Sequence, residues 1–410
     1  MKPSKKALKI AGISALALVA AAAVVWLVLF RFGNSGLQGR IAALRAAGDP
    51  VSLKDLARPA VPAEQNAASF LFLAQNDVDA INKTLSPVYD GAGYRQGKLS
   101  ESDRKAIRRA LASHPKAIVL LEQAGACPDF DAHLNYTGGP SVLMTNCLGK
   151  MQGFRGVANL LRARAYLLAA EGNPTVALGS CTLLFRLTRL YEREPPLLVT
   201  YLVTAASRSL GVETANVVLR SGAVDQTAHA ELEKELAATD GLEGYRRALR
   251  DERAFGIESF DAIPGAGLNP FLSRDRCEHL DQMADQLALA EKPFAEVLPA
   301  LLRIKQGKSA SQPLTGLVMP AVLKAREAMD RVRAQMRCLR VLNALMRISS
   351  LDAKLSDLGL PAEATTDPYN GSPLHIKRVA GGWLIYAVGE NLTDDGGDLS
   401  GMKDVGLGPQ

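Results

Sequence analysis

Residues 158–190 read ANLLRARAYLLAAEGNPTVALGSCTLLFRLTRL, and this stretch decides the fold class. Alanine, leucine and arginine dominate it, and these side chains lose little rotamer freedom in a helical turn. Gly172, Asn173 and Pro174 interrupt the pattern in its middle. Because glycine favours the end of a helix and proline is tolerated at the first helical position, the stretch predicts two helices joined by a short turn.

The spacing of small and apolar residues in this hairpin resembles one tetratricopeptide unit. The positions that carry the resemblance are Leu161, Ala165, Leu168, Gly172, Ala177 and Leu184. In such a unit, small residues let two antiparallel helices approach closely. Generic packing of two helices rich in alanine and leucine explains the same positions, because the pattern does not recur at a fixed period. Both interpretations predict a mainly α-helical protein.

Helical periodicity covers most of the chain outside this stretch. It begins at residues 67–81, and Ser100 with Asp103 resembles a capping pair that opens a second helical hairpin. Pro195 and Pro196 separate the central hairpin from a third helix. Later helices are expected at residues 226–238, 242–260, 276–290, 293–304 and 318–348.

The last of these segments has an amphipathic pattern with arginines at helical spacing. They are Arg326, Arg333, Arg337, Arg340 and Arg347. The pattern predicts a helix whose apolar face meets the core and whose arginine face is solvated. Asp330 is interpreted as an ordinary surface partner of its arginine neighbours.

An uncharged apolar segment near the N-terminus predicts a membrane anchor. Residues 10–30 read IAGISALALVAAAAVVWLVLF, and a helix of that length rises roughly 30 Å, the thickness of a hydrocarbon core. Four lysines precede it, so the positive-inside rule places residues 1–9 in the cytoplasm and the bulk of the chain in the periplasm or outside the cell. A cleaved signal peptide is the alternative, but the bulky residues that follow its A-x-A pattern favour a retained span.

The net charge of +6 belongs to this anchor region. Residues 1–40 hold six basic side chains and no acidic one, so residues 41–410 are neutral overall. Proteins that bind nucleic acids gather basic residues on their binding surfaces. The distribution of charge therefore excludes a nucleic-acid partner for the folded part.

The five cysteines leave the question of disulfides open. Cys127 and Cys147 flank a loop that contains glycine and proline, and an oxidising compartment would permit a bridge between them. Buried free thiols are the alternative, and the odd number leaves at least one cysteine unpaired.

The remaining chain divides into a tether at residues 31–62, a helical ectodomain at residues 63–360 and a C-terminal region at residues 361–410. In the C-terminal region the period shifts from helical to alternating. The runs LHIKRVA and WLIYAV, separated by Gly381 and Gly382, predict a β-hairpin. A lone hairpin is marginally stable, so we expect it to pack on the helices.

An acidic loop follows the hairpin and predicts a calcium site. Residues 389–398 read GENLTDDGGD and carry Asp394, Asp395 and Asp398 among glycines. Ca²⁺ prefers hard oxygen ligands, which carboxylates and backbone carbonyls of a flexible loop supply. A solvated acidic turn is the alternative interpretation.

The residues DPYNGSPL at 367–374, the hairpin, and YAVG at 386–389 with the acidic loop resemble the C-terminal region of type II secretion major pseudopilins. The resemblance implies that an aspartate–proline turn leads into a short sheet. It also implies that Asp394, Asp395 and Asp398 bind calcium, with backbone carbonyls near Leu392 completing the shell. Residues 10–30 lack the glutamate and the processing site of a pilin subunit, so the resemblance does not extend to polymerisation.

The sequence contains no G-x-S-x-G, no P-loop, no H-E-x-x-H, and no G-x-G-x-x-G before a helix. It therefore predicts a membrane-anchored scaffold or protein-interaction protein of a bacterial envelope. Its partner would be another envelope protein, and the C-terminal tail relates it to secretion. The alternative is an envelope hydrolase whose catalytic residues lie far apart in the sequence.

Overall fold

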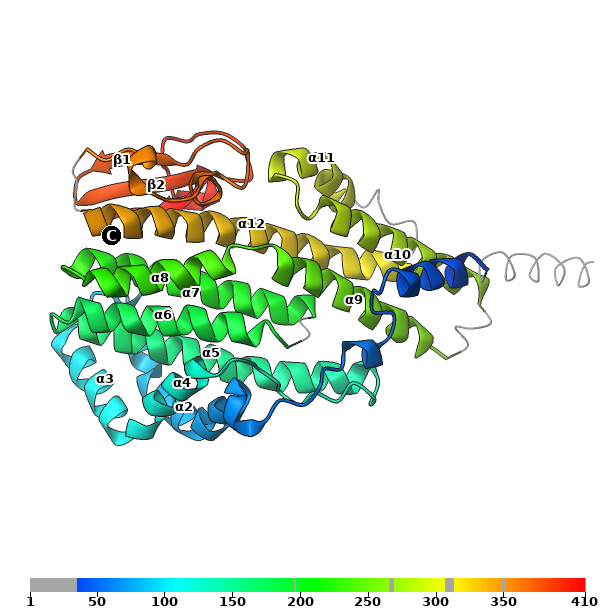
Figure 1. The fold of residues 1–410 in the computed structure, drawn as a ribbon, viewed down its shortest axis with the longest axis horizontal. Helices are drawn as coiled ribbons and strands as arrows, with labels where there is room; N and C mark the ends of the chain where they lie inside the picture. The colour runs from blue at the N-terminus through cyan, green and yellow to red at the C-terminus, as the bar shows by residue number, and fades with distance from the viewer. Residues whose placement is uncertain (1–34, 195–196, 265–268, 307–312, 349–351, 410) are drawn as a thin grey trace, which may run out of the picture.

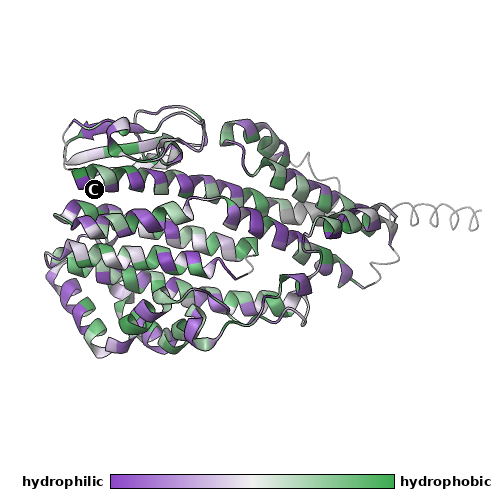
Figure 2. Ribbon diagram, in the orientation of Figure 1, coloured by the Kyte–Doolittle hydropathy of each residue, from purple (hydrophilic) through white to green (hydrophobic). Residues whose placement is uncertain are grey.

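The computed structural model describes residues 35–194, 197–264, 269–306, 313–348 and 352–409. Its helices run largely side by side along one long axis, and a small sheet covers one end (Figure 1). The helices are α2 (Ala67–Tyr89), α3 (Glu101–Ser113), α4 (Pro115–Ala126), α5 (Pro140–Ala170), α6 (Pro174–Tyr191), α7 (Leu198–Ser221), α8 (Gln226–Thr239), α9 (Glu243–Asp261), α10 (Pro270–Leu289), α11 (Phe294–Lys305) and α12 (Pro313–Ile348). The prediction of a mainly helical fold is confirmed. Figure 2 shows hydrophobic and hydrophilic residues interspersed along these helices, as expected for helices with one buried face.

The hairpin formed by α5 and α6 has the turn that the sequence predicts. Gly172 adopts φ +79°, in the left-handed region that glycine enters without strain, and Pro174 is the first residue of α6. Ala165 and Ala177 are fully buried in one core cluster with residues of α7, α8 and α12. The two helices therefore pack against each other and against the centre of the molecule.

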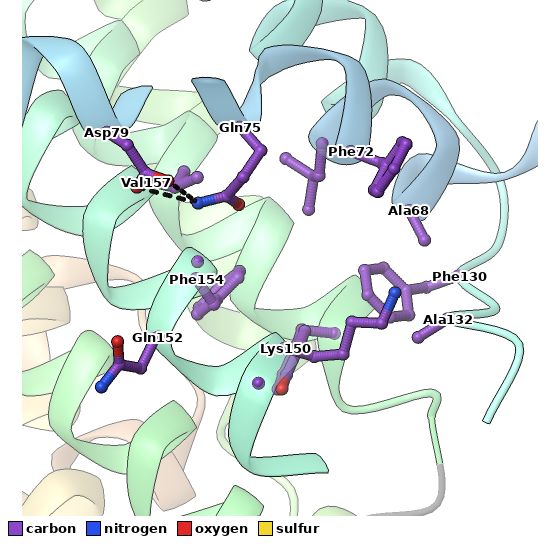
Figure 3. Close-up of a pocket in the computed structure, with 14 residues that line it drawn as sticks. Ala68, Phe72, Gln75, Asp79, Phe130, Ala132, Lys150, Gln152, Phe154 and Val157 are labelled. Carbon is purple, nitrogen blue, oxygen red and sulfur yellow. Dashed lines mark hydrogen bonds between the residues drawn. The ribbon is translucent and has the colours of Figure 1, made fainter. Parts of the chain in front are cut away.

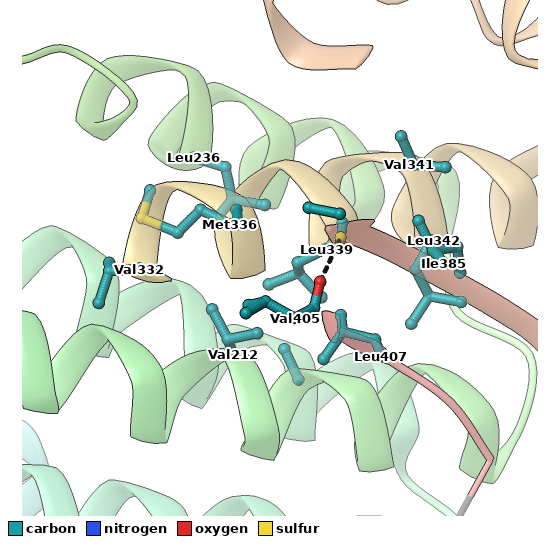
Figure 4. Close-up of a cluster of buried hydrophobic side chains, with 14 of the residues drawn as sticks. Val212, Leu236, Val332, Met336, Leu339, Val341, Leu342, Ile385, Val405 and Leu407 are labelled. Atoms are coloured by element: carbon teal, nitrogen blue, oxygen red, sulfur yellow. Dashed lines mark hydrogen bonds between the residues drawn. The ribbon is translucent and has the colours of Figure 1, made fainter. Parts of the chain in front are cut away.

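Helix α12 is the centre of the larger core. It packs against α7 and α8 on one side and against the C-terminal sheet on the other. Figure 4 shows Met336 and Leu339 of α12 among side chains from these neighbours, including Val212 of α7 and Leu407 of the sheet. A long helix that is apolar on two faces thus joins the helical part and the sheet in one core.

The sheet has three antiparallel strands in the order β1 (His375–Val379), β2 (Gly382–Val388) and β3 (Asp404–Leu407). The predicted hairpin is confirmed, with Gly381 at φ +87° in its turn. As expected, the hairpin packs on the helices. The third strand was not predicted, because DVGL is short and contains a glycine, which weakens any strand pattern.

The arginine face of α12 is not solvated, so that prediction is wrong. Arg326, Arg337 and Arg340 expose at most 5% of their surface, and Asp330 is fully buried. Each of the three guanidinium groups donates hydrogen bonds to carboxylates: Asp330, Asp240, and Asp240 with Glu233 respectively. Helical periodicity cannot distinguish a solvated charged face from one that neighbouring carboxylates neutralise.

The segment predicted as a tether is partly folded onto the body. Residues 35–46 are helical, and Leu37 and Ile41 are buried against Ile257 of α9 and Leu280 of α10. Arg40 forms two hydrogen bonds of 2.7 Å with Asp281. The apolar residues of this segment are few, but their burial and the ion pair are enough to fix it in place.

Among the residues that the structure describes, no helix is long and apolar enough to cross a bilayer. The span predicted at residues 10–30 lies outside them. Cys127 and Cys147 are separate buried thiols with no bridge between them. Burial raises the pKa of the Cys147 thiol to about 11.

Candidate functional site

A groove with a cavity of about 390 Å³ lies between α2 and α5 (Figure 3). Its floor is aromatic. The Phe154 ring stacks on Tyr191 with 4.5 Å between ring centres, and Phe130 meets the same tyrosine edge-on at 5.2 Å. A volume of this size lies within the roughly 300–1,000 Å³ typical of pockets that bind ligands.

Helix α2 forms one wall of the groove. This part of the helix contains four large apolar residues in a row, at positions 70–73. A helix that packs on one face cannot bury four consecutive side chains. Phe72, which lines the cavity, therefore keeps 75% of its surface exposed, and the neighbouring Leu73 keeps 64%. The wall therefore presents a large aromatic side chain to solvent beside the cavity.

Helix α5 forms the other wall, where glycine replaces larger side chains at two positions of the lining. A Cβ atom on Gly153 would lie only 2.3 Å from the end of the Gln75 side chain, so a larger residue here would displace the Gln75 amide from its present position. A Cβ atom on Gly149 would meet nothing within 4 Å, so the cavity is open beside this residue.

The two ends of the groove carry opposite charges. Figure 3 shows Asp79 and Lys150 towards opposite ends. Gln75 Nε2 donates to both oxygens of Asp79 at 2.9 Å. Lys150 Nζ lies 5.8 Å from the centre of the Phe72 ring and forms no ion pair with any residue of the described part of the chain. A ligand with an apolar body and charged ends would therefore be oriented in the groove by those charges.

A second cleft, with a cavity of about 550 Å³, lies between the N-terminal segment and α9. Asp251 lines it with only 4% of its surface exposed, and its Oδ2 atom accepts no hydrogen bond. Burial raises the pKa of Asp251 to about 7, although Arg247 and Arg250 oppose the shift. Arg247 Nε lies 3.7 Å from Oδ2, which is too far for a hydrogen bond.

The three aspartates of the predicted calcium site lie in one loop, but their carboxylates are engaged separately. Asp394 accepts a hydrogen bond from the Tyr386 hydroxyl, Asp395 from the Asn391 amide, and Asp398 from Lys403 Nζ at 2.9 Å. Hydrogen bonds from Ser400 and Lys403 hold the pKa of Asp398 well below its usual range. Within the described residues, no three acidic, histidine or cysteine side chains are grouped to hold a metal ion. Oxygen ligands suit calcium, but in this conformation they do not converge.

Two other aspartates organise this region, and sequence reasoning missed both roles. Asp404, 2% exposed, accepts hydrogen bonds from the backbone N–H groups of Asp395 and Gly397 and so holds the loop against β3. Asp367 accepts from the N–H groups of Tyr369 and Val388 and so ties the aspartate–proline turn to β2. These aspartates accept hydrogen bonds from backbone N–H groups, and no sequence motif distinguishes such aspartates from those that bind a metal ion.

The sequence also left the groove unrecognised, although two signals for it exist. The run of four apolar residues at 70–73 exceeds what one helix face buries. Gly149 and Gly153 are spaced by one turn on α5, which indicates a close helix approach. Neither signal shows which two helices of the chain pack together to form the groove, because that depends on tertiary packing.

No protein-family model, no curated protein and no solved structure matches the chain.

Proposed function

We propose that the chain is a membrane-anchored scaffold of a bacterial envelope and that the groove between α2 and α5 binds an amphipathic helix of a protein partner. The observation that carries this proposal is Phe72, a large apolar side chain that is 75% exposed at the edge of a cavity with an aromatic floor. Helix-in-groove recognition places apolar anchors of one helix in such a cavity. Residues 10–30 would serve as the anchor.

The charges at the two ends of the groove indicate which charged residues the partner helix would carry. From Phe72 to Asp79, α2 makes about two turns, or ~10 Å, so the groove accepts apolar side chains from about two turns of a helix. An acidic residue of the partner would pair with Lys150, and a basic residue would pair with Asp79. Opposite charges in this order would fix the direction in which the partner helix lies.

Site-specific photocrosslinking in the envelope tests this proposal. A photoreactive residue at Gln152, which lines the groove, should capture segments that are amphipathic helices with an acidic residue near the crosslinked position. Phe72→Asp should lower the yield by at least about tenfold, because it replaces an aromatic contact with a charge, and loss of a key aromatic contact at an interface typically costs about 2 kcal/mol or more. Lys150→Glu should lower the yield, and reversal of the partner's acidic residue should restore it.

Val119→Asp supplies the matched control. Val119 is 53% exposed on α4 and lies outside the groove lining. Equal yields from the Phe72 and Val119 variants, or captured segments without an amphipathic helical pattern, would contradict the proposal. Retention of the full chain in the membrane after alkaline extraction, and its release after deletion of residues 10–30, would test the anchor.

One observation favours the alternative of an envelope hydrolase. Asp251 combines a pKa of about 7, a position in a cleft and an oxygen that accepts no hydrogen bond. A carboxyl group with such a pKa is suited to general acid–base catalysis near neutral pH. Hydrolysis of ester, peptide or glycoside reporters with an apparent pKa near 7, lost in Asp251→Asn, would favour the enzyme. Absence of turnover by the purified full chain on all three would count against it.

A further inference from the structure

A third cleft, with a cavity of about 650 Å³, lies where the α8–α9 corner meets α12. Arg333, Arg337 and Arg340 of α12 line it, and Arg246 of α9 lines it as well. The three arginines of α12 share one carboxylate, Asp240. The structure thus gathers several guanidinium groups around a single buried acid.

Two of these arginines form hydrogen bonds with carboxylates. Arg337 Nε lies 3.1 Å from Asp240, and its Nη1 donates to the carbonyl of Thr366. Arg340 donates to Asp240 at 3.3 Å and twice to Glu233 Oε1. The two carboxylates therefore balance the charges of Arg337 and Arg340.

Arg333 forms no hydrogen bond within the described residues, and it shares its ion-pair partner, Asp240, with Arg337 and Arg340. Its Nε lies 3.8 Å from Asp240, which is beyond hydrogen-bond distance, and among the described residues the guanidinium donates to no acceptor. Its side chain is only 19% exposed. Burial and the nearby Arg337 both lower the pKa of Arg333. The Nε atom of Arg333 is inaccessible to solvent and has no hydrogen-bond partner, and leaving a buried donor unsatisfied is unfavourable.

The acidic residues of the lining do not supply the missing acceptor. Glu291 pairs with Arg246, and Glu243 pairs with Arg250 outside the cleft lining. Glu363 forms no ion pair within the described part of the chain, but it is exposed. Arg333 is therefore the arginine of this cleft whose carboxylate contact is longest, and Glu363 opposes an anion that approaches it.

We propose that this cleft binds a small oxyanion, a phosphate or a carboxylate group, through the guanidinium of Arg333. Both groups present two oxygens at a spacing that matches the fork of an arginine. The site lies on elements other than the groove between α2 and α5, so it does not depend on the proposed function.

Titration of the purified full chain with inorganic phosphate and, separately, with acetate tests the site and distinguishes the two sources. Sodium chloride keeps the ionic strength constant. We expect a saturable rise in melting temperature with at least one probe, and for phosphate a matching broadening of the ³¹P resonance. Arg333→Gln should weaken binding by at least about tenfold, because charge-assisted hydrogen bonds are lost. Glu363→Gln should tighten it, because a repelling charge is removed.

Arg303→Gln is the matched control, since Arg303 is exposed on α11 and lies outside the cleft. Arg333→Lys keeps the charge and provides a second test if Arg333→Gln fails to fold, with intermediate affinity expected. Phosphate also stabilises proteins through exclusion from their surfaces. A rise of equal size in wild type and Arg333→Gln, or no saturation with either anion, would overturn the proposal.

Discussion

Asp330 accepts a hydrogen bond of 2.6 Å from Nε of Arg326, one turn earlier on α12, and the two side chains expose only 1% and 2% of their surfaces. The same guanidinium donates to the carbonyls of Leu289 at 2.8 Å and Lys292 at 2.7 Å. Leu289 is the last residue of α10, where helical carbonyls lack intrahelical partners. Arg326 therefore caps α10 and fixes it to α12.

Arg326→Leu should lower the free energy of unfolding by about 3–5 kcal/mol, because Asp330 would remain buried without a partner. Arg326→Leu combined with Asp330→Leu should recover part of this loss, since apolar residues can replace a buried ion pair. Urea denaturation of the two variants measures both effects. If the double variant were no more stable than the single one, the loss of stability would come mainly from the carbonyl contacts of Arg326 and not from the unpaired carboxylate of Asp330.

The arginines of α12 show how far the sequence alone predicts this fold. Helix positions follow from local signals such as Gly172, Pro174 and the Ser100 cap, whose side chain accepts from Asp103 N–H as expected. Which face of α12 is buried depends on Asp240 and Glu233, which lie about a hundred residues earlier in the chain. Pairing between residues so far apart in the sequence produces no periodic pattern. The helix was therefore predicted correctly, but the environment of its arginine face was predicted wrongly.

The candidate site could be predicted only in part for a similar reason. The acidic loop stands out because its aspartates are adjacent in sequence. The groove combines Phe72 of α2 with Lys150 of α5, and Asp251 becomes unusual only through burial beside the N-terminal segment. Cavities and shifted pKa values arise from tertiary packing, and no local pattern encodes them.

Asp251 should make stability depend on pH. Burial raises the pKa of its carboxyl group from an ordinary value of 3.8 to about 7, so the folded protein holds a proton that the unfolded chain releases. The folded state gains stability by binding this proton more tightly than the unfolded chain does. This stabilisation is fully present below pH 3.8 and is lost as the pH rises through 7. Asp251→Asn should therefore be more stable than wild type at pH 8 by on the order of 2 kcal/mol, with the difference shrinking towards pH 4. Urea denaturation across this range measures it, and a difference independent of pH would contradict the assignment.

Gly256 should tolerate no larger residue. A Cβ atom there would lie 2.4 Å from Nε2 of His279, whose side chain is 1% exposed in the contact between α9 and α10. Gly256→Ala should cost about 1–3 kcal/mol through overpacking. Gly179 on α6 is exposed and its Cβ would meet nothing, so Gly179→Ala should instead stabilise by about 0.4–1 kcal/mol. Thermal unfolding of both variants is the measurement, and a loss of equal size in both would refute the steric explanation.

Calcium should stabilise the C-terminal loop if its carboxylates can converge on the ion. Binding would require Asp398 to leave Lys403, whose Nζ lies 2.9 Å away. Excess calcium should then raise the melting temperature of the full chain, because a ligand that binds only the folded state stabilises it. Asp394→Ala should abolish the rise, whereas Asp285→Ala, at an exposed position of α10, should leave it intact. Lys403→Gln should strengthen the response, since it removes a competing cation. An unchanged melting curve in excess calcium would show that the loop is a solvated acidic turn held by its own hydrogen bonds.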